Sequence, residues 1–456
     1  MKFLIVSNEG ASNGIAWKLK KEGHEVCQFI KEPLARNSLV TQVTSIKEGL
    51  RGGVDVILFD SPGHGKEADD LRTEGYNVIG GGIWNDKLAF DSKFSMKAMD
   101  SFGIKTQPSY LFNNIQDAME FVAQHNKPLS FNGIRTKSQD ELLSHMIHMK
   151  KHLGFEGKIL LQEAIEGVDV SVEVWYAKGK VCPQPTSSFD SHGFMPGDLG
   201  ATTVSQSSVI FAYPKREPRI VQQSLKKIDL LMERTKYSGP LSIRGVVKAG
   251  KFYGLEFTPS IKYSSIYAFI RLLDEKLGDV LFRVASGDNK AIKLKEGFGY
   301  SVKCTIPPYP FTHAIAVIHK EVYQRIAHQK VFIEKQDLDT RIFPLDMYND
   351  SKGNLYTGGF NGVVCEATGY GLDLWEAEKE ASVAFRKIGV VHKQGRLDGA
   401  RTAMRKMDDL RRQGYEVPPF VKPEILVFVE ESKDEKIASI IVDASVSSAS
   451  AIQEHN

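Results

Sequence analysis

Residues 161–173 have the sequence LQEAIEGVDVSVE, and the fold is inferred outward from this stretch. From Val168 onward, valines at every second position alternate with Ser171, Glu173 and Trp175. Such a period of two predicts an antiparallel strand with one buried face. An apolar run at 158–162 predicts another strand directly before it. The stretch therefore predicts two successive strands with a short connection around Gly167.

The N-terminal part of the chain alternates short apolar strands with helices. A strand at 2–6 is followed by a glycine-containing turn at 7–14 and a helix at 15–22, and further strands are expected at 25–30 and 54–60. This order predicts a parallel sheet, whose ligands gather beyond the carboxyl ends of its strands. Because the turn lacks a complete G-x-G-x-x-G pattern, it indicates either a nucleotide-binding loop or an ordinary strand-to-helix turn.

Between that region and the opening stretch, the pattern becomes mainly helical. A strand at 77–82 precedes a charged amphipathic helix at 86–102, which Gly103 ends. A domain boundary is expected directly after this helix. Beyond it the sequence predicts helices at 115–125 and 139–152 and a strand at 128–131.

The part that follows the opening stretch is more varied. Residues 187–208 are polar, contain glycine and show no periodicity, so a long loop with a functional role or without fixed structure is expected. A helix at 217–235 and a β-hairpin at 241–257 come next. Alternating strands then lead to two long charged helices at 375–388 and 397–413.

Composition and charge exclude several classes of protein. With 456 residues the chain is too long for one compact core, so two to four domains are expected. Its 59 basic and 56 acidic residues give a formal charge of +3, which provides no general attraction for nucleic acid or an anionic membrane. No run approaches 18 apolar residues, and the apolar start is too short for a secretory signal. A cytoplasmic protein is therefore expected.

The cysteines lack the close spacing of a zinc or redox motif. They are expected to be reduced thiols, mostly buried. The four residues are Cys27, Cys182, Cys304 and Cys365.

In the order of these pieces, the chain resembles the glycinamide ribonucleotide synthetases, also called phosphoribosylamine–glycine ligases, of the ATP-grasp superfamily. The resemblance runs from Met1 to about Tyr415. It is most specific at 161–173, which is similar to the hinge strand that holds adenine and ribose in that family. Three further segments resemble the approach to the nucleotide-binding lobe, the glycine-rich loop and the metal-binding strand of the family: 93–108, 195–200 and 254–257.

The resemblance implies an α/β (α+β) architecture with the ATP-grasp fold. The expected parts are an N-terminal parallel-sheet (pre-ATP-grasp) domain at 1–103, a small ATP-grasp lobe at 104–176, a large lobe at 177–296, a C-terminal α/β domain at 297–420 and a partly disordered tail at 421–456.

It also implies a reaction. Enzymes of this family transfer the γ-phosphoryl group of ATP to a carboxylate, and an amine then attacks the acyl phosphate. Magnesium ions, basic side chains and backbone amides must neutralise the transferring group. The implied cofactors are ATP and Mg²⁺, and the implied partners are a nucleotide and a carboxylate–amine pair, bound by a monomer or a dimer.

The nucleotide-binding residues follow from the hinge match. The resemblance implies that Gln162, Glu163 and Ile165 surround adenine and that Asp169 binds the ribose. An ordinary antiparallel strand with an exposed acid is the alternative. The family's substrate-facing loops correspond to Asn8, Gly10, Asp198 and Gly200.

The phosphate end departs from the family. Asn132 stands where a lysine is expected, and most of the glycine-rich segment after it is missing. Either Lys137 or Arg135 then supplies positive charge to the phosphates from a new position, or both side chains are solvated and have no such role. At the metal strand Glu256 is kept, but Thr258 replaces an asparagine. The ligand set for Mg²⁺ is therefore incomplete.

Two other basic residues are candidates for a catalytic role. Arg244 interrupts an apolar strand next to Glu256, and Lys262 follows that strand. Both residues could supply positive charge to the phosphates. For Arg244, an ion pair with a neighbouring acid is the alternative. His192 is expected to be a loop histidine without a function. Residues 61–64, SPGH, replace the Gly-Pro-Glu expected near phosphoribosylamine and leave that substrate open.

Three hypotheses follow. Loss of one electrostatic stabiliser typically lowers the rate about 10²- to 10³-fold, so the first is a diverged protein that binds nucleotide but has weak or lost phosphoryl transfer. The second is an active ligase for another acid and another amine. The third is a non-catalytic scaffold that uses the basic residues of its C-terminal helices.

Overall fold

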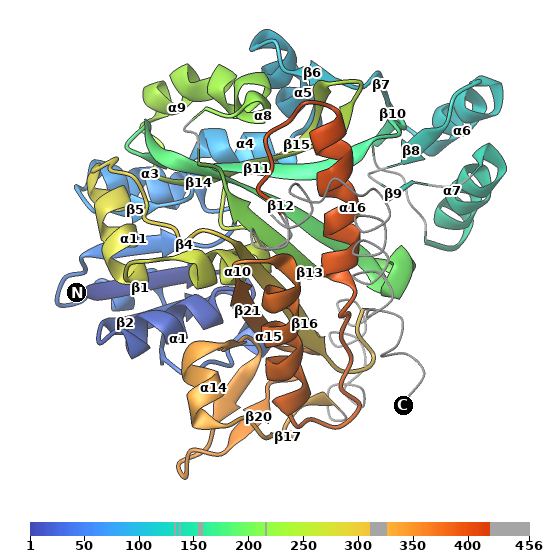
Figure 1. The fold of residues 1–456 in the computed structure, drawn as a ribbon. Coiled ribbons are helices and arrows are strands. Elements are labelled where there is room, and N and C mark those ends of the chain that lie inside the picture. Colours follow the sequence, from blue (N-terminus) through green and yellow to red (C-terminus); the bar gives the residue numbers. More distant parts are fainter. Residues whose placement is uncertain (132–133, 136–137, 154–157, 215–216, 311–325, 420–456) are drawn as a thin grey trace, which may run out of the picture.

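The computed structural model describes residues 1–131, 134–135, 138–153, 158–214, 217–310 and 326–419. Four β-sheets organise these residues, and the small sheet with its two helices projects from one side of the molecule (Figure 1). The predicted tail and the predicted phosphate residues Asn132 and Lys137 lie outside the described residues.

Five parallel strands form the N-terminal sheet, as the sequence predicts. The apolar run of β1 is buried throughout, which is typical of a parallel sheet with helices on both faces. In spatial order the strands are β3 (Thr41–Val43), β2 (Glu25–Ile30), β1 (Lys2–Ser7), β4 (Val56–Phe59) and β5 (Val78–Ile79). The short helices between them are α1 (Asn13–Lys21), η1 (Pro33–Ala35), α2 (Ile46–Gly49) and α3 (Gly65–Thr73).

The helix predicted over 86–102 is wrong in its extent. Two helices, α4 (Ile83–Phe90) and α5 (Ser92–Ser101), occupy this region. Asp91 separates them because its side chain accepts a hydrogen bond from the Phe94 amide and so acts as the N-cap of α5. The chain then enters β6 (Lys105–Thr106), which pairs with the edge of the largest sheet.

The small lobe comprises a four-stranded antiparallel sheet and two helices. In spatial order its strands are β7 (Ser109–Phe112), β10 (Ile159–Glu163), β8 (Leu129–Phe131) and β9 (Ile134–Arg135). Its helices are α6 (Ile115–Gln124) and α7 (Gln139–Leu153). The lobe has its own hydrophobic core, which includes Val122, Phe131 and Leu161.

A nine-stranded sheet crosses the centre of the molecule. In spatial order its strands are β18 (Ile342–Pro344), β21 (Val363–Gly371), β16 (Phe298–Thr305), β13 (Leu199–Ala212), β12 (Lys180–Met195), β11 (Val168–Ala177), β14 (Gly239–Lys248), β15 (Lys251–Thr258) and β6. The predicted antiparallel strand at β11 and the predicted hairpin β14–β15 are both confirmed, although Ser171 and Trp175 on the second face of β11 are buried as well.

The loop predicted at 187–208 is wrong, because the residues belong to the long hairpin of β12 and β13, joined by η2 (Pro196–Asp198). Polar side chains misled the prediction: the strands carry serines and Asp190 that are buried and hydrogen-bonded. A strand that places a polar network inside the protein has no apolar alternation to detect.

The helix predicted at 217–235 is also broken. It is divided into α8 (Arg219–Gln223), η3 (Leu225–Ile228) and α9 (Asp229–Thr235). Ser224, between the first two, has φ −127° and ψ −105°, which a continuous helix does not allow.

Helices cover both faces of the large sheet. α10 (Ser265–Leu272) and α11 (Leu277–Ser286) lie between it and the N-terminal sheet, whereas α15 (Leu374–Lys387) and α16 (Gly399–Arg412) cover its other side (Figure 1). The remaining elements are α14 (Lys335–Thr340) and a three-stranded sheet of β17 (Lys330–Val331), β20 (Leu355–Thr357) and β19 (Met347–Asn349).

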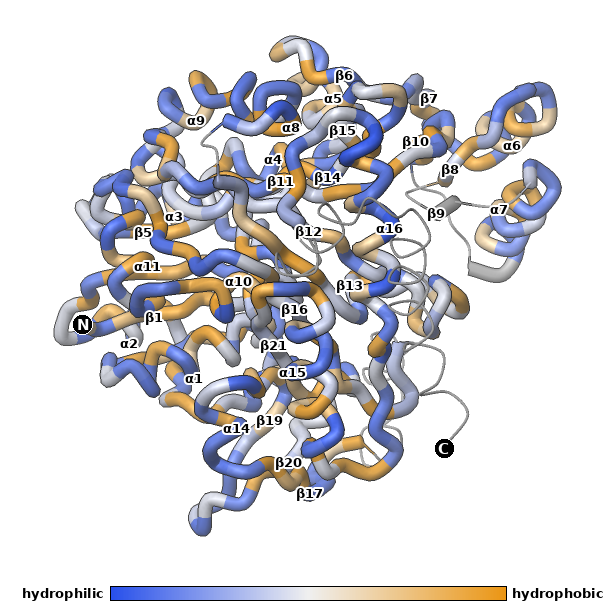
Figure 2. Tube along the Cα trace, in the orientation of Figure 1, coloured by the Kyte–Doolittle hydropathy of each residue, from blue (hydrophilic) through white to orange (hydrophobic). Residues whose placement is uncertain are grey.

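Burial agrees with this layering. Apolar residues concentrate along β1 and α10 (Figure 2), and seven of the eight residues of α10 are buried. All four cysteines are free and buried, as predicted. Among the described residues, no helix combines the length and apolarity needed to cross a membrane.

Candidate functional site

Three of the predicted site residues meet in one cavity between the small lobe and the edge of the large sheet. Gln162, Arg244 and Glu256 line this space of about 310 Å³. Its other lining residues are Leu88, Ala89, Ser92, Ser95, Met96, Gln107, Ser130, Leu160, Leu255 and Phe257. We call it the hinge cavity. Its volume is at the lower end of the roughly 300–1,000 Å³ of small-molecule sites.

Arg244 forms the strongest charge contact at this cavity. Its Nη2 and Nε donate to the two carboxylate oxygens of Asp169 at 2.7 and 3.2 Å, and its Nη1 lies 3.4 Å from Glu256 Oε1. Burial alone would raise the pKa of Asp169, but the guanidinium outweighs burial and holds that pKa well below its usual range. Arg244 therefore joins the predicted ribose acid and the predicted metal ligand through a single cation.

The hinge segment presents mainly backbone groups. Ser130 Oγ donates to the Gln162 carbonyl at 3.3 Å, and the amide of Glu163 donates to the Pro108 carbonyl at 2.9 Å. The Glu163 side chain does not face the cavity, since it binds Lys127 Nζ at 2.8 Å on the small lobe. No bond of the Ile165 amide is found within the described part of the chain. Ile165 itself is not among the residues that line the hinge cavity.

Glu256 is a largely exposed acid. Its side chain is 60% exposed, and Arg244 is its recorded ionic partner. Within the described ranges, no group of three or more His, Cys, Asp or Glu residues could hold a metal ion. The neighbouring Thr258 offers one neutral oxygen. Mg²⁺ prefers several hard, anionic oxygen ligands, so the described residues do not fit a dedicated magnesium site.

Lys262 lies deeper, on the buried face of the large sheet. Its ammonium donates to Ser188 Oγ at 3.0 Å and forms an ion pair with Asp190. Burial would raise the pKa of Asp190, but Lys262 and His192 hold it below its usual range. Glu173, on the adjacent strand, has a pKa raised by burial to about 7 despite the opposing effect of Lys262. Lys262 is thus committed to internal acids.

This polar face continues across the sheet to a second cavity. Lys303 on β16 pairs across the strands with Glu366 on β21, and both line a space of about 170 Å³ next to the N-terminal glycine turn. We call it the glycine-loop cavity. Its other lining residues are Glu9, Gly10, Ala11, Val204, Tyr263, Ser264, Tyr267, Tyr309, Leu345, Asp346, Asn361 and Val363.

The predicted substrate loops are held by internal contacts. Gly10 lines the glycine-loop cavity with φ +76°, a conformation that favours glycine. The Asn8 side chain donates from Nδ2 to Ser61 Oγ at 3.0 Å, and its Oδ1 lies 2.8 Å from His64 Nε2. Asn8 therefore ties the first loop to the segment 61–64, which departs from the family motif.

The loop at 195–200 is anchored to the C-terminal region. Asp198 accepts from Arg396 Nη1 at 2.5 Å, and Asp398 binds both Arg396 Nε at 2.6 Å and the Gly197 amide at 2.9 Å. The Arg396 side chain is 0% exposed. Gly200 follows with φ +77° and lines neither cavity.

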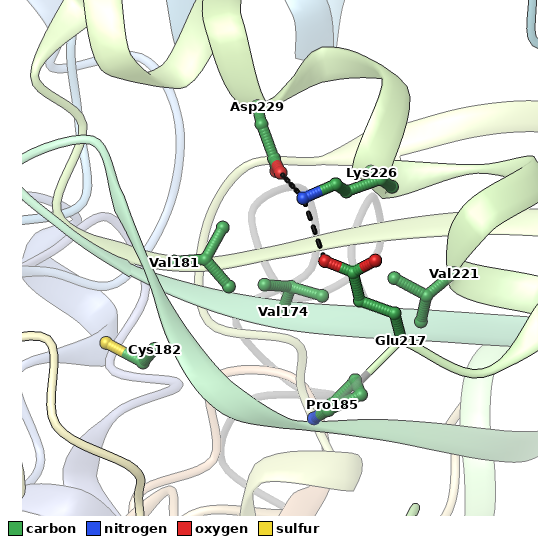
Figure 3. A pocket seen from close by; sticks show the side chains of 8 residues that line it. All are labelled: Val174, Val181, Cys182, Pro185, Glu217, Val221, Lys226 and Asp229. Carbon is green, nitrogen blue, oxygen red and sulfur yellow. Dashed lines mark ion pairs between the residues drawn. The ribbon is translucent and has the colours of Figure 1, made fainter. Parts of the chain in front are cut away.

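A third cavity lies apart from all of these residues. Lys226 bridges Glu217 and Asp229 at its rim, at 2.9 and 3.3 Å (Figure 3). The space amounts to about 20 Å³, enough for a water molecule rather than a substrate.

Four of the seven basic residues predicted for a scaffold form ion pairs; the seven are Arg386, Lys387, Arg396, Arg401, Arg405, Arg411 and Arg412. Lys387 binds Glu334 and Asp337, each at 3.1 Å, and Arg396 is buried. Arg411 and Arg412 pair with acids three residues earlier on the same helix. These helices therefore have ordinary mixed-charge faces.

The chain was compared with proteins of known sequence. No family model matches it. The phosphoribosylamine–glycine ligase of Neisseria meningitidis serogroup B is 20% identical over 441 residues, which cover 89% of this chain and 100% of that protein. The enzyme of the same name from Pyrococcus horikoshii is 21% identical over 234 residues, covering 46% of this chain and 52% of that protein. The predicted resemblance is confirmed.

Solved structures show the same relationship. A phosphoribosylamine–glycine ligase from Thermotoga maritima superposes with a TM-score of 0.63 at 19% identity, covering 87% of this chain and 100% of that chain. The fold is the ATP-grasp fold. The biotin carboxylase domain of the Hydrogenobacter thermophilus 2-oxoglutarate carboxylase, solved with MgADP and bicarbonate, gives a TM-score of 0.57 at 13% identity and covers 91% of this chain and 95% of that chain.

Within this ATP-grasp chain, sequence reasoning missed the buried charges of Lys303 and Glu366, and it grouped the buried Arg396 with the basic residues of the C-terminal helices. Lys303 and Glu366 each stand alone in strands that are otherwise apolar or small, and Arg396 follows a glycine in a loop before α16. A lone charge inside a buried strand is a usable signal, because burying a charge is costly unless it is paired or functional. The position of Arg396 gives no comparable signal.

Proposed function

We propose that this chain is a nucleotide-binding ATP-grasp protein that diverged from the ADP-forming carboxylate–amine ligases of purine synthesis, with phosphoryl transfer weak or lost. The hinge cavity would hold ATP, with the base near the Ile165 amide and the phosphates toward Arg244. The confirmed resemblance to phosphoribosylamine–glycine ligases supports the nucleotide and the ligase ancestry.

One observation carries the proposal. Arg244 binds Asp169 and Glu256 together, and so provides a fixed cation between the acids expected to serve ribose and metal. A guanidinium can bind a phosphate in two-point geometry. It cannot bridge two phosphates and a transferring group as paired metal ions do. If Arg244 meets the phosphates in place of paired metal ions, ATP binds but phosphoryl transfer is inefficient.

The test is a calorimetric titration with ATP, once with magnesium and once with excess chelator, followed by an ADP-release assay. The proposal expects similar ATP affinity in both titrations and no ADP above the buffer control. ATP binding that requires magnesium, or ADP formation that requires an added acid and amine, would overturn it.

The second candidate is an active ligase with another acid and another amine, in the cytoplasm and with magnesium brought by the nucleotide. The glycine-loop cavity favours it, because a cavity of about 170 Å³ lined by charged groups and tyrosines is retained beside the expected substrate loop. Under this alternative, ADP appears with the right substrates and Glu256→Gln abolishes its release.

A further inference from the structure

Glu366 is an unusual group in the glycine-loop cavity. Its side chain is 0% exposed, and Ser264 Oγ donates to its Oε1 at 2.8 Å. Its other oxygen, Oε2, is buried and has no hydrogen-bond partner among the described residues. A buried carboxylate oxygen without a donor is costly, and native proteins rarely leave one so. A ligand that donates a hydrogen bond there would remove that cost.

The surroundings fix this carboxylate in place. Ser264 has φ +63° and directly precedes α10, and its carbonyl accepts from Ser301 Oγ at 2.9 Å. Glu366 itself sits in the paired part of β21, opposite Lys303. Since both neighbours are held by the sheet and helix, the Glu366 carboxylate is fixed beside the cavity.

The charge of the cavity favours a cation. Lys303 is the single base among its described lining residues, against the acids Glu9, Asp346 and Glu366. The Lys303 ammonium is itself buried, which lowers its pKa, although the charges of Glu366 and Asp190 oppose that lowering. Asp346 is already satisfied by the Asn37 side chain and the Phe360 amide. Glu366 is therefore the acid with an open position.

The remaining lining fits a small organic cation. Tyr263, Tyr267 and Tyr309 border the space, and Tyr267 is oriented by a 2.7 Å hydrogen bond from its hydroxyl to the Ala11 carbonyl. Aromatic faces attract ammonium groups. A phosphate, in contrast, needs several cations or a cluster of amides, and Lys303 is the one basic residue among the described lining residues.

We propose that the glycine-loop cavity binds a compact primary amine that carries no phosphate, with its ammonium donating to Glu366 Oε2. The inference rests on the proposed function and extends it, because it names the chemical class of the amine that this site would bind. It differs from the phosphorylated amine named in the similar enzymes. Its test measures amine binding in the absence of nucleotide, so its failure is separate from a failure of ATP to bind.

The first experiment uses the full chain and ligands of equal size. Binding of benzylamine, benzyl alcohol and benzoate is measured by calorimetry or ligand-observed NMR. Benzylamine is expected to bind about 10-fold more tightly than the alcohol, the range for a hydrogen bond to a charged group, and benzoate least tightly. Ethanolamine is likewise expected to bind more tightly than O-phosphoethanolamine. Tighter binding of benzoate or of the phosphorylated amine would overturn the proposal without any variant.

The second experiment locates the site. Glu366→Gln keeps the shape and removes the charge, so benzylamine should fall to the affinity of benzyl alcohol. Glu378→Gln is the matched control, because Glu378 is a partly buried acid on α15, outside the cavity, whose pKa burial also raises to about 7. Unchanged benzylamine affinity in the folded Glu366→Gln variant, or an equal loss in both variants, would contradict the assignment.

Discussion

Replacing Glu256 by glutamine separates the two ways in which the hinge cavity could bind ATP. The Glu256 carboxylate lies 3.4 Å from Arg244 Nη1 and partly neutralises it. If Arg244 alone meets the phosphates, Glu256→Gln leaves a stronger net positive charge and metal-free ATP binds more tightly. If Glu256 instead holds magnesium, the same change removes a ligand and MgATP binds more weakly. Whether ATP affinity rises or falls in Glu256→Gln therefore distinguishes the two modes of binding.

The size of the effect follows from exposure. Two unit charges 4 Å apart interact by about 1 kcal/mol in water, and exposed pairs contribute between about 0 and 1 kcal/mol. Because the Glu256 side chain is 60% exposed, a gain of about 2- to 5-fold in ATP affinity is expected. The gain should shrink at high salt, since screening weakens contacts between exposed charges.

The assay is calorimetry with chelator present, comparing the wild-type chain, Glu256→Gln and Glu233→Gln. Glu233 is an exposed acid on α9 and controls for the change in net charge. Tighter binding confined to Glu256→Gln supports the account. Weaker binding in Glu256→Gln, or an equal gain in both variants, would refute the reasoning.

Three further predictions use other parts of the site. Arg244→Met should weaken ATP binding about 10-fold or more, whereas Arg412→Met, which removes an exposed pair, should leave it unchanged in the same titration. Arg396→Met should lower the free energy of unfolding by about 1.5 to 3 kcal/mol in urea titrations, because it removes hydrogen bonds to two carboxylates, of which Asp198 is 53% exposed and stays hydrated; a loss under 1 kcal/mol would contradict this. For Glu366, burial raises the pKa to about 7, so the folded state keeps a proton that the unfolded state releases as pH rises from about 4.5 to 7. Between pH 5 and pH 8, the free energy of unfolding of the wild-type chain should therefore fall by up to about 3 kcal/mol relative to that of Glu366→Gln. Parallel pH profiles of the two chains would contradict this prediction.

Much of the framework was predictable from the sequence because it depends on apolar periodicity. The strand at 25–30 and the hairpin within 239–258 follow from runs of β-prone residues, and the order of the pieces pointed to the ATP-grasp fold. The hairpin at 180–212 was missed because its buried face is polar. Periodicity reports apolar burial and is silent about an internal hydrogen-bond network.

The sequence predicted which residues belong to the site better than it predicted the contacts between them. Arg244 and Glu256 face each other, as neighbouring positions of a hairpin indicate. That Arg244 would bind Asp169 as well depends on the register of a third strand, β11, which the sequence does not specify. The partnership of Arg396 with Asp198 joins residues 198 positions apart and can be seen only in the fold.

The most direct measurement is a crystal structure of the chain with a non-hydrolysable ATP analogue and Mn²⁺, in which bound metal is located by anomalous scattering. The account predicts the triphosphate in contact with the Arg244 guanidinium and no anomalous peak at coordination distance from Glu256. Two manganese ions that bridge Glu256 and the phosphates, with Arg244 turned away, would contradict it.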